Sequence, residues 1–123
     1  MFVKEERIPI SLDSEDKPYE ERNVIYIKPK MDYGTVARVQ DAAARVEVDS
    51  KGDAKATMEM LVGSYNVALL TENIVGWSGP AFEGVPCTAD NIKRLDPDDP
   101  LVNRVLAEIN VRNTRRKVDP KGL

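Results

Sequence analysis

The sequence predicts a mainly α fold with a small β component: a compact helical domain of about four helices with a short N-terminal β-hairpin or strand pair. Three observations lead to this class. Two long segments repeat apolar residues at helical spacing, two later segments begin with good capping residues, and the best strand pattern lies near the N-terminus. A length of 123 residues suits one domain with one modest core.

Residues 1–22 form a polar N-terminal arm, in which the run "SLDSEDKPYEER" is typical of a loop. An edge strand is expected within this arm, because Ile8, Ile10 and Leu12 alternate and Pro9 would restrict such a strand to a sheet edge. The following "NVIYIKPKM" is rich in β-branched and aromatic residues and is the best strand of the chain. We expect it to pair with the segment near Phe2 to Leu12, because a lone strand is not stable.

The stretch "MDYGTVARVQDAAARVEV" predicts the first helix. Its apolar side chains recur on one helical face, at Val36, Val39, Ala43 and Val46. Asp32 or Thr35 can cap its start by accepting a hydrogen bond from a free backbone N–H. The helix should end before "DSKGDAK".

The second helix, about Ala54 to Val75, is the strongest predicted element. Apolar residues surround much of its circumference: Met58, Leu61, Val62, Tyr65, Ala68, Leu69 and Leu70. A helix of this kind lies centrally in a bundle or buries a second face against another chain. Gly63 costs about 1 kcal/mol relative to alanine in a helix interior, and we expect it to allow close approach of a neighbour.

The C-terminal third begins with a Gly/Pro-rich loop, "GWSGPAFEGVP", and then continues into two capped helices. Thr88 is a good N-cap for a short helix, and Asp99 followed by Pro100 is expected to start the last one. Residues 23–111 are therefore predicted to form a single helical domain. Residues 112–123, a basic stretch without periodicity, are predicted to be a disordered tail.

Composition narrows the function classes. A net charge of −3 disfavours nucleic acid as a main partner, and no segment approaches the roughly 20 apolar residues of a membrane span. The N-terminus lacks a signal-peptide core, so we expect a cytoplasmic protein. The chain has no histidine and a single cysteine, Cys87, which argues against a zinc site, a catalytic thiol and most acid–base chemistry. No catalytic residue, metal or cofactor is predicted.

Trp77 and Phe82 raise the main functional question, because the largest apolar side chains lie in a predicted loop. One interpretation is a lid over the helix ends that completes the core. The other is an anchor for a partner protein, since aromatic residues are enriched at interface hot spots. Both interpretations remain open at this point.

The order of elements resembles the tail assembly chaperones of long-tailed bacteriophages. In that family a helix ends near a tryptophan and is followed by a loop of the form F-x-G-x-P-x-T-x-x-N-I-x-x-L, a short helix and a closing helix. The matching residues here are Trp77, Phe82, Gly84, Pro86, Thr88, Asn91, Ile92 and Leu95. The similarity covers about Val24 to Val111.

The resemblance implies a non-enzymatic protein of the host cytoplasm that binds the tape-measure protein during virion assembly, with the tail tube protein as a further expected partner. The expected partner-binding residues are Trp77 and Phe82, with Leu69, Leu70 and Ile74 forming or supporting the same face. Self-association into a homo-oligomer would bury this surface equally well. The alternatives are a head–tail connector or tail-completion protein that stays in the virion, and an enzyme that uses carboxylates.

Overall fold

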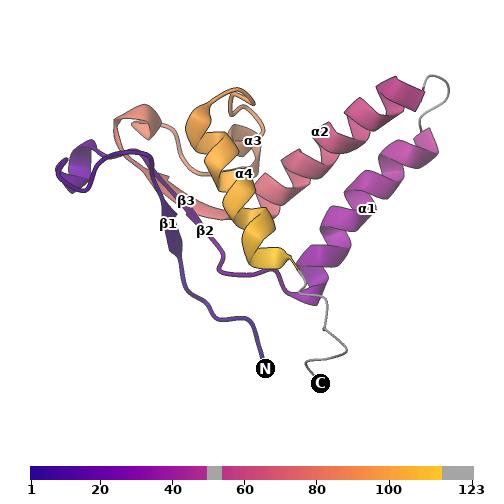
Figure 1. Ribbon diagram of the computed structural model, residues 1–123, viewed down its shortest axis with the longest axis horizontal. Coiled ribbons are helices and arrows are strands. Elements are labelled where there is room, and N and C mark those ends of the chain that lie inside the picture. The colour runs from indigo at the N-terminus through magenta and orange to yellow at the C-terminus, as the bar shows by residue number, and fades with distance from the viewer. Residues whose placement is uncertain (50–53, 115–123) are drawn as a thin grey trace, which may run out of the picture.

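A computed structural model describes residues 1–49 and 54–114, and within its two long helices the side chains up to Ala44 and from Val62 onward. The elements are β1 (Ile8–Ile10), the 3-10 turn η1 (Tyr19–Glu21), β2 (Val24–Ile27), α1 (Tyr33–Asp49), α2 (Ala54–Asn73), β3 (Ile74–Ser78), the 3-10 turn η2 (Pro80–Phe82), α3 (Ala89–Ile92) and α4 (Pro100–Asn113). Figure 1 shows the sheet and α4 packed together, with α1 and α2 extending away from them as a helical hairpin.

The structure corrects the predicted fold class. A mainly α domain with only an N-terminal strand pair was expected, but β2 pairs on both sides, giving an antiparallel three-stranded sheet in the order β1-β2-β3. The added strand, Ile74–Ser78, lies where the second helix was predicted to end and the Gly/Pro-rich loop to begin. The described residues therefore form a small α+β domain, in which the sheet includes a strand from the middle of the chain and is more than an N-terminal addition.

The α2–β3 junction explains why the helix prediction ran too far. No loop separates the two elements: α2 ends at Asn73, a fully buried residue whose Nδ2 donates to the carbonyl oxygen of Leu69 at 2.8 Å. The carbonyl oxygen of Asn73 accepts from the backbone N–H of Lys28 at 3.0 Å. The chain thus changes from helix to strand because its backbone groups find partners beside β2, a tertiary effect that periodicity does not report.

The hydrophobic core lies between one face of the sheet, α4 and the C-terminal part of α2. Ile25 and Ile27 of β2 are fully buried, and they meet Val105 and Ile109 of α4 and Leu69 of α2 in one apolar cluster. On the opposite face, Tyr26 is only partly covered. The Tyr19 hydroxyl contacts its hydroxyl, and the Arg7 guanidinium lies 5.0 Å from its ring centroid.

Polar residues define the helix starts. Asp32 Oδ1 accepts from the N–H of Thr35 at 2.8 Å, so Asp32 is the residue that caps α1. Thr88 accepts from Asn91 N, and Asp99 accepts from the first free N–H groups of α4, with Pro100 at the first helical position. These capping predictions are confirmed.

The hairpin of α1 and α2 is held at its base by an ion pair, in which Arg38 Nε lies 2.8 Å from Glu72 Oε1. The close neighbour expected at Gly63 is not found among the described residues, since no described atom lies within 4 Å of a Cβ built there. Val62, Tyr65 and Val67 in the same part of α2 are substantially exposed. This part of α2 therefore retains an uncovered apolar surface. The predicted apolar positions Val46, Met58 and Leu61 lie outside the described side chains.

Candidate protein-binding surface

The residues predicted to bind a partner separate into two groups. Leu69, Leu70 and Ile74 belong to the buried core, with exposed fractions of 1%, 8% and 6%. Leu69 and Leu70 belong to α2 and Ile74 to β3, and all three pack in the core, so they can support a surface from inside but cannot contact a partner directly. Trp77 and Phe82 are half-buried and reach the surface.

Trp77 and Phe82 form one stacked unit. Their ring centroids are 4.9 Å apart with an angle of 13° between the ring planes. The indole Nε1–H donates to the carbonyl oxygen of Val85 at 2.7 Å, which fixes the tryptophan to the loop beyond Phe82. Both rings also pack against the hydrophobic core. The two rings therefore cover part of the core, as the lid interpretation expects, while part of the stack remains at the surface.

Gly79 and Asn23 join the loop that carries this stack to the start of β2 through a close backbone contact and a hydrogen bond. Gly79 has φ 114° and ψ 172°, a conformation that essentially only glycine adopts. A Cβ at this position would overlap the carbonyl oxygen of Arg22, so the missing side chain also permits close backbone contact. Two residues further on, the N–H of Ala81 donates to Asn23 Oδ1 at 2.9 Å.

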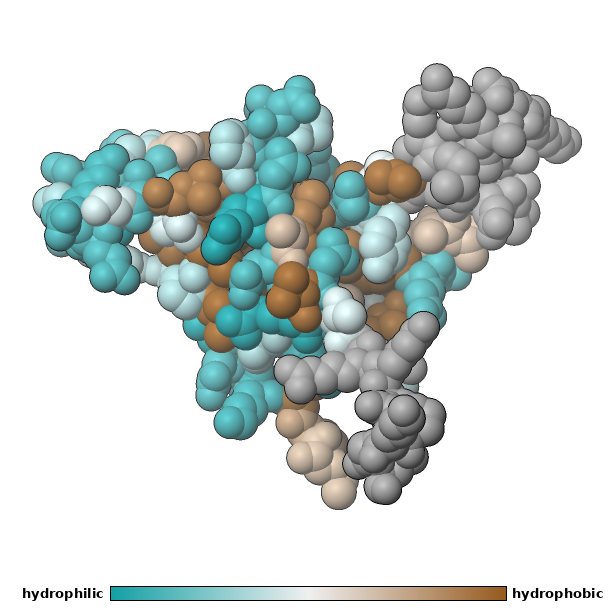
Figure 2. Space-filling view, viewed as in Figure 1, coloured by the Kyte–Doolittle hydropathy of each residue, from teal (hydrophilic) through white to brown (hydrophobic). Residues whose placement is uncertain are grey.

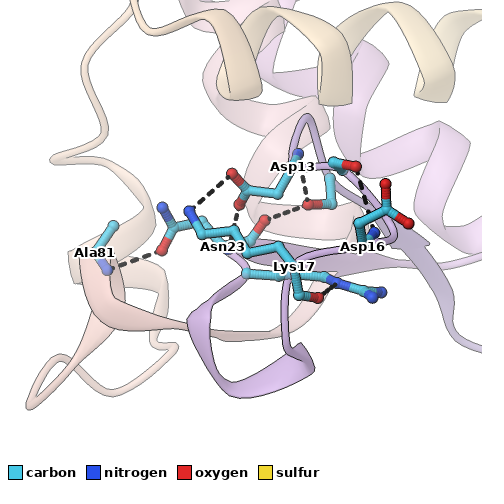
Figure 3. A network of polar contacts seen from close by, with 8 residues as sticks. Asp13, Asp16, Lys17, Asn23 and Ala81 are labelled. Atoms are coloured by element: carbon cyan, nitrogen blue, oxygen red, sulfur yellow. Dashed lines mark hydrogen bonds and ion pairs between the residues drawn. The ribbon is translucent and has the colours of Figure 1, made fainter.

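The same asparagine connects the stack to the N-terminal arm (Figure 3). The backbone N–H of Asn23 donates to Asp13 Oδ2 at 2.7 Å, and Ser11 Oγ donates to the carbonyl oxygen of Asn23 at 2.8 Å. The N–H of Asn23 lowers the pKa of the Asp13 carboxyl below its ordinary value, and Lys17 lowers it further. The charged carboxylate therefore helps to hold residues 11–23 against the sheet.

A larger groove was not predicted from the sequence. It has a volume of about 950 Å³ and lies where the N-terminus, the start of α1, the side of α2 and the end of α4 converge. Its most prominent apolar side chains are Phe2 and Tyr33, exposed by 92% and 85%, and Tyr65, exposed by 37%. In the space-filling view, apolar residues reach the surface in several patches around α4 and the base of the hairpin (Figure 2).

One hydrogen bond fixes the inner wall of this groove. The backbone N–H of Met31 donates to Asn113 Oδ1 at 2.8 Å, which joins the end of α4 to the segment preceding α1. Residues far apart in sequence are brought together by this contact, so no local motif could have indicated the groove. The only sequence signal was the excess of apolar residues around the second helix, which includes Tyr65.

The structure also bears on the thiol of Cys87 and on possible metal ligands. Cys87 is partly buried, and this burial raises the pKa of its thiol, which disfavours the reactive thiolate. Within residues 1–49 and 54–114, no group of three or more Asp, Glu, Cys or His side chains is placed to hold a metal ion. In the same part of the chain, no helix combines the length and apolar character needed to cross a membrane.

Comparison with known proteins does not assign the chain to a family. A scan against protein-family models, a search of curated proteins and a search of solved structures each found no match. The likeness to tail assembly chaperones therefore depends on the motif between Trp77 and Leu95 and on the order of the flanking elements.

Proposed function

We propose that this protein is a non-enzymatic tail assembly chaperone of a long-tailed bacteriophage, which binds the tape-measure protein in the host cytoplasm and keeps it soluble while the tail tube assembles. The observation that carries the proposal is the groove beside the helical hairpin, where Phe2, Tyr33 and Tyr65 are exposed together. Exposed aromatic side chains gathered at one groove are typical of protein-binding sites.

The groove suits a helical partner. A tape-measure protein that is not yet enclosed by its tube presents apolar helical stripes, and such a stripe binds by inserting side chains into an apolar groove. Here the walls come from α1, α2 and α4, while Lys30, Asp32 and Asn110 provide a polar border. An apolar centre with a polar border allows the free chaperone to stay in solution and still bind an apolar segment.

Trp77 and Phe82 provide a second contact in this proposal. Their stacked rings are accessible at one side, and Leu69, Leu70 and Ile74 support the sheet and α2 from the core. The tail tube protein is a further expected partner, and a second copy of this chain could cover the groove in the absence of either partner. Light scattering of the isolated protein distinguishes a monomer from a homo-oligomer.

Co-expression with tape-measure fragments tests the proposal. The double variant Phe2→Ala/Tyr33→Ala should lower recovery of the soluble complex about tenfold or more, because each truncation removes an exposed aromatic contact worth more than about 1 kcal/mol. Tyr19→Ala is the matched control, since Tyr19 is also an exposed tyrosine but does not line the groove. Circular dichroism should show that each variant remains folded.

Two results would count against the proposal. If the double variant yields as much soluble complex as the unchanged protein, the groove does not bind the tape-measure fragments. Mass spectrometry that finds this chain at fixed stoichiometry in mature particles would instead favour a connector or tail-completion protein.

A further inference from the structure

A second cavity, of about 490 Å³, lies between the end of β3 and the loop that follows it. Trp77 and Phe82 form its aromatic wall, Ser78 and Gly79 lie at the strand end, and Glu20 and Glu83 also line it. Glu20 comes from η1 and Glu83 follows η2, so segments far apart in sequence bring two acidic residues to one aromatic cavity.

The walls of this cavity are fixed by hydrogen bonds and close packing. The indole of Trp77 is bonded to Val85 O, and the ring of Phe82 lies almost parallel to it. The backbone at Gly79 packs against the carbonyl of Arg22, which allows little movement of the strand end. A ligand would therefore meet a cavity that is already formed, which reduces the entropy lost on binding.

The charged residues that line the cavity are all acidic. Its described lining residues include two glutamates and no lysine or arginine. The two arginines of the adjoining segments make other contacts: Arg7 donates to Val75 O and lies over the Tyr26 ring, and Arg22 Nε donates to the carbonyl oxygen of Lys17. Neither arginine is paired with Glu20 or Glu83 in these contacts, although the charge of Arg7 still acts on Cys87, which also lines the cavity.

One further group at the cavity lacks a partner. The hydroxyl oxygen of Ser78 is buried and makes no hydrogen bond in the structure, although Ser78 lines the cavity. A buried hydroxyl without a partner is costly and uncommon. Because this oxygen has almost no accessible surface, a donor from a ligand would reach it only if the Ser78 side chain turned toward the cavity.

We propose that this cavity binds an arginine side chain of a partner protein. A planar guanidinium can stack on an aromatic face while its N–H groups donate to carboxylate and hydroxyl oxygens, and arginine does both better than lysine. The site is separate from the groove of Phe2 and Tyr33. It shares Trp77 and Phe82 with the second contact of the proposed function and deepens it by selecting a charged residue, but its test on the isolated protein does not depend on that function. It adds specificity to a surface whose other contacts are hydrophobic.

The single tryptophan makes the proposal directly measurable. Trp77 is the only tryptophan of the chain, so intrinsic fluorescence and the indole N–H signal in NMR report on this cavity alone. The probes are N-acetyl-arginine methylamide and N-acetyl-citrulline methylamide, which have nearly the same shape but differ in charge. The arginine probe should change both signals saturably and more weakly at high salt, whereas the citrulline probe should produce no saturable change.

Variants of the two carboxylates complete the test. Glu20→Gln and Glu83→Gln should each weaken binding of the arginine probe by up to about fivefold, the range measured for exposed charge pairs. Glu21→Gln is the matched control, because Glu21 is a neighbouring exposed acid that does not line the cavity. Equal responses to the two probes, no saturable response to arginine, or unchanged affinity in both Glu20 and Glu83 variants would each overturn the proposal.

Discussion

Replacing Gly79 by alanine tests how the Trp77–Phe82 unit is attached to the sheet. At φ 114° and ψ 172° a non-glycine residue carries strain of about 1–3 kcal/mol. The new Cβ would also overlap the carbonyl oxygen of Arg22, so the strand end must move. That movement would weaken or break the hydrogen bond from Ala81 N to Asn23 Oδ1, which contributes about 0.5–1.5 kcal/mol to stability. The middle values of these two ranges add to an expected loss of stability of about 3 kcal/mol, before any cost of the overlap itself.

Gly84→Ala provides the matched control. Gly84 also has a positive φ, of 74°, but among the described residues no atom beyond its chain neighbours lies within 4 Å of a Cβ built there. Its replacement should therefore cost only the left-handed backbone strain of about 1–2 kcal/mol. Urea unfolding followed by tryptophan fluorescence measures these losses. If the free energy of unfolding falls by about 2 kcal/mol per molar urea, the urea concentration at the midpoint should decrease by about 1.5 M or more for Gly79→Ala and by about 0.5–1 M for Gly84→Ala. Equal decreases would refute the close packing at Gly79.

Three other changes give further tests. Asp99→Ala should lower the free energy of unfolding by about 1 kcal/mol through loss of the α4 cap, whereas Asp98→Ala should have little effect in the same urea assay. Leu69→Ala should cost about 2–5 kcal/mol because Leu69 is 1% exposed, and a near-neutral effect would contradict its core position. The lowered pKa of Asp13 means that its bond from Asn23 stabilises the fold above the ordinary value of 3.8, and that this stabilisation is lost as the pH falls through the lower folded-state pKa. Asp13→Asn should therefore weaken the pH dependence of stability below about pH 4. If the pH dependence in this range is unchanged in the variant, this role of Asp13 is contradicted.

Local chemistry made much of the helical part of the fold predictable. The starts of α3 and α4 follow from Thr88 and Asp99, because an N-cap acts through N–H groups only two or three residues away. The strand of Val24 to Ile27 was likewise evident from its residue types, and β1 lies at a sheet edge, where Pro9 lacks the N–H that an inner strand would need.

The third strand was not predictable in this way. The segment Ile74–Ser78 follows a helix with no turn residue between them, and Gly76 within it is unfavourable for a strand. The Arg7 guanidinium lies where a Cβ at position 76 would be, although the end of this flexible side chain could move aside. Pairing with β2 and this contact across the sheet are tertiary effects, which outweigh the local preference of the segment.

The candidate surface was predictable only in part. The unusual loop position of Trp77 and Phe82 was visible in the sequence, but whether each apolar residue of α2 faces the core or solvent depends on where the sheet and α4 pack. Leu69 and Leu70 are therefore buried while Tyr65 is exposed, although the sequence groups them together. The groove at Tyr33 requires the N-terminus and the end of α4 to meet, which no local pattern indicates.

Chemical-shift mapping with an apolar helical peptide from the tape-measure protein tests whether the groove is the partner-binding surface. The amide signals of the groove residues Phe2, Tyr33 and Tyr65 should shift most on titration, with smaller changes near Trp77. The peptide should no longer bind once the groove aromatics Phe2 and Tyr33 are replaced by alanine. Shifts confined to other parts of the molecule, or the absence of shifts at saturating peptide, would contradict the assignment of this groove as the partner-binding surface.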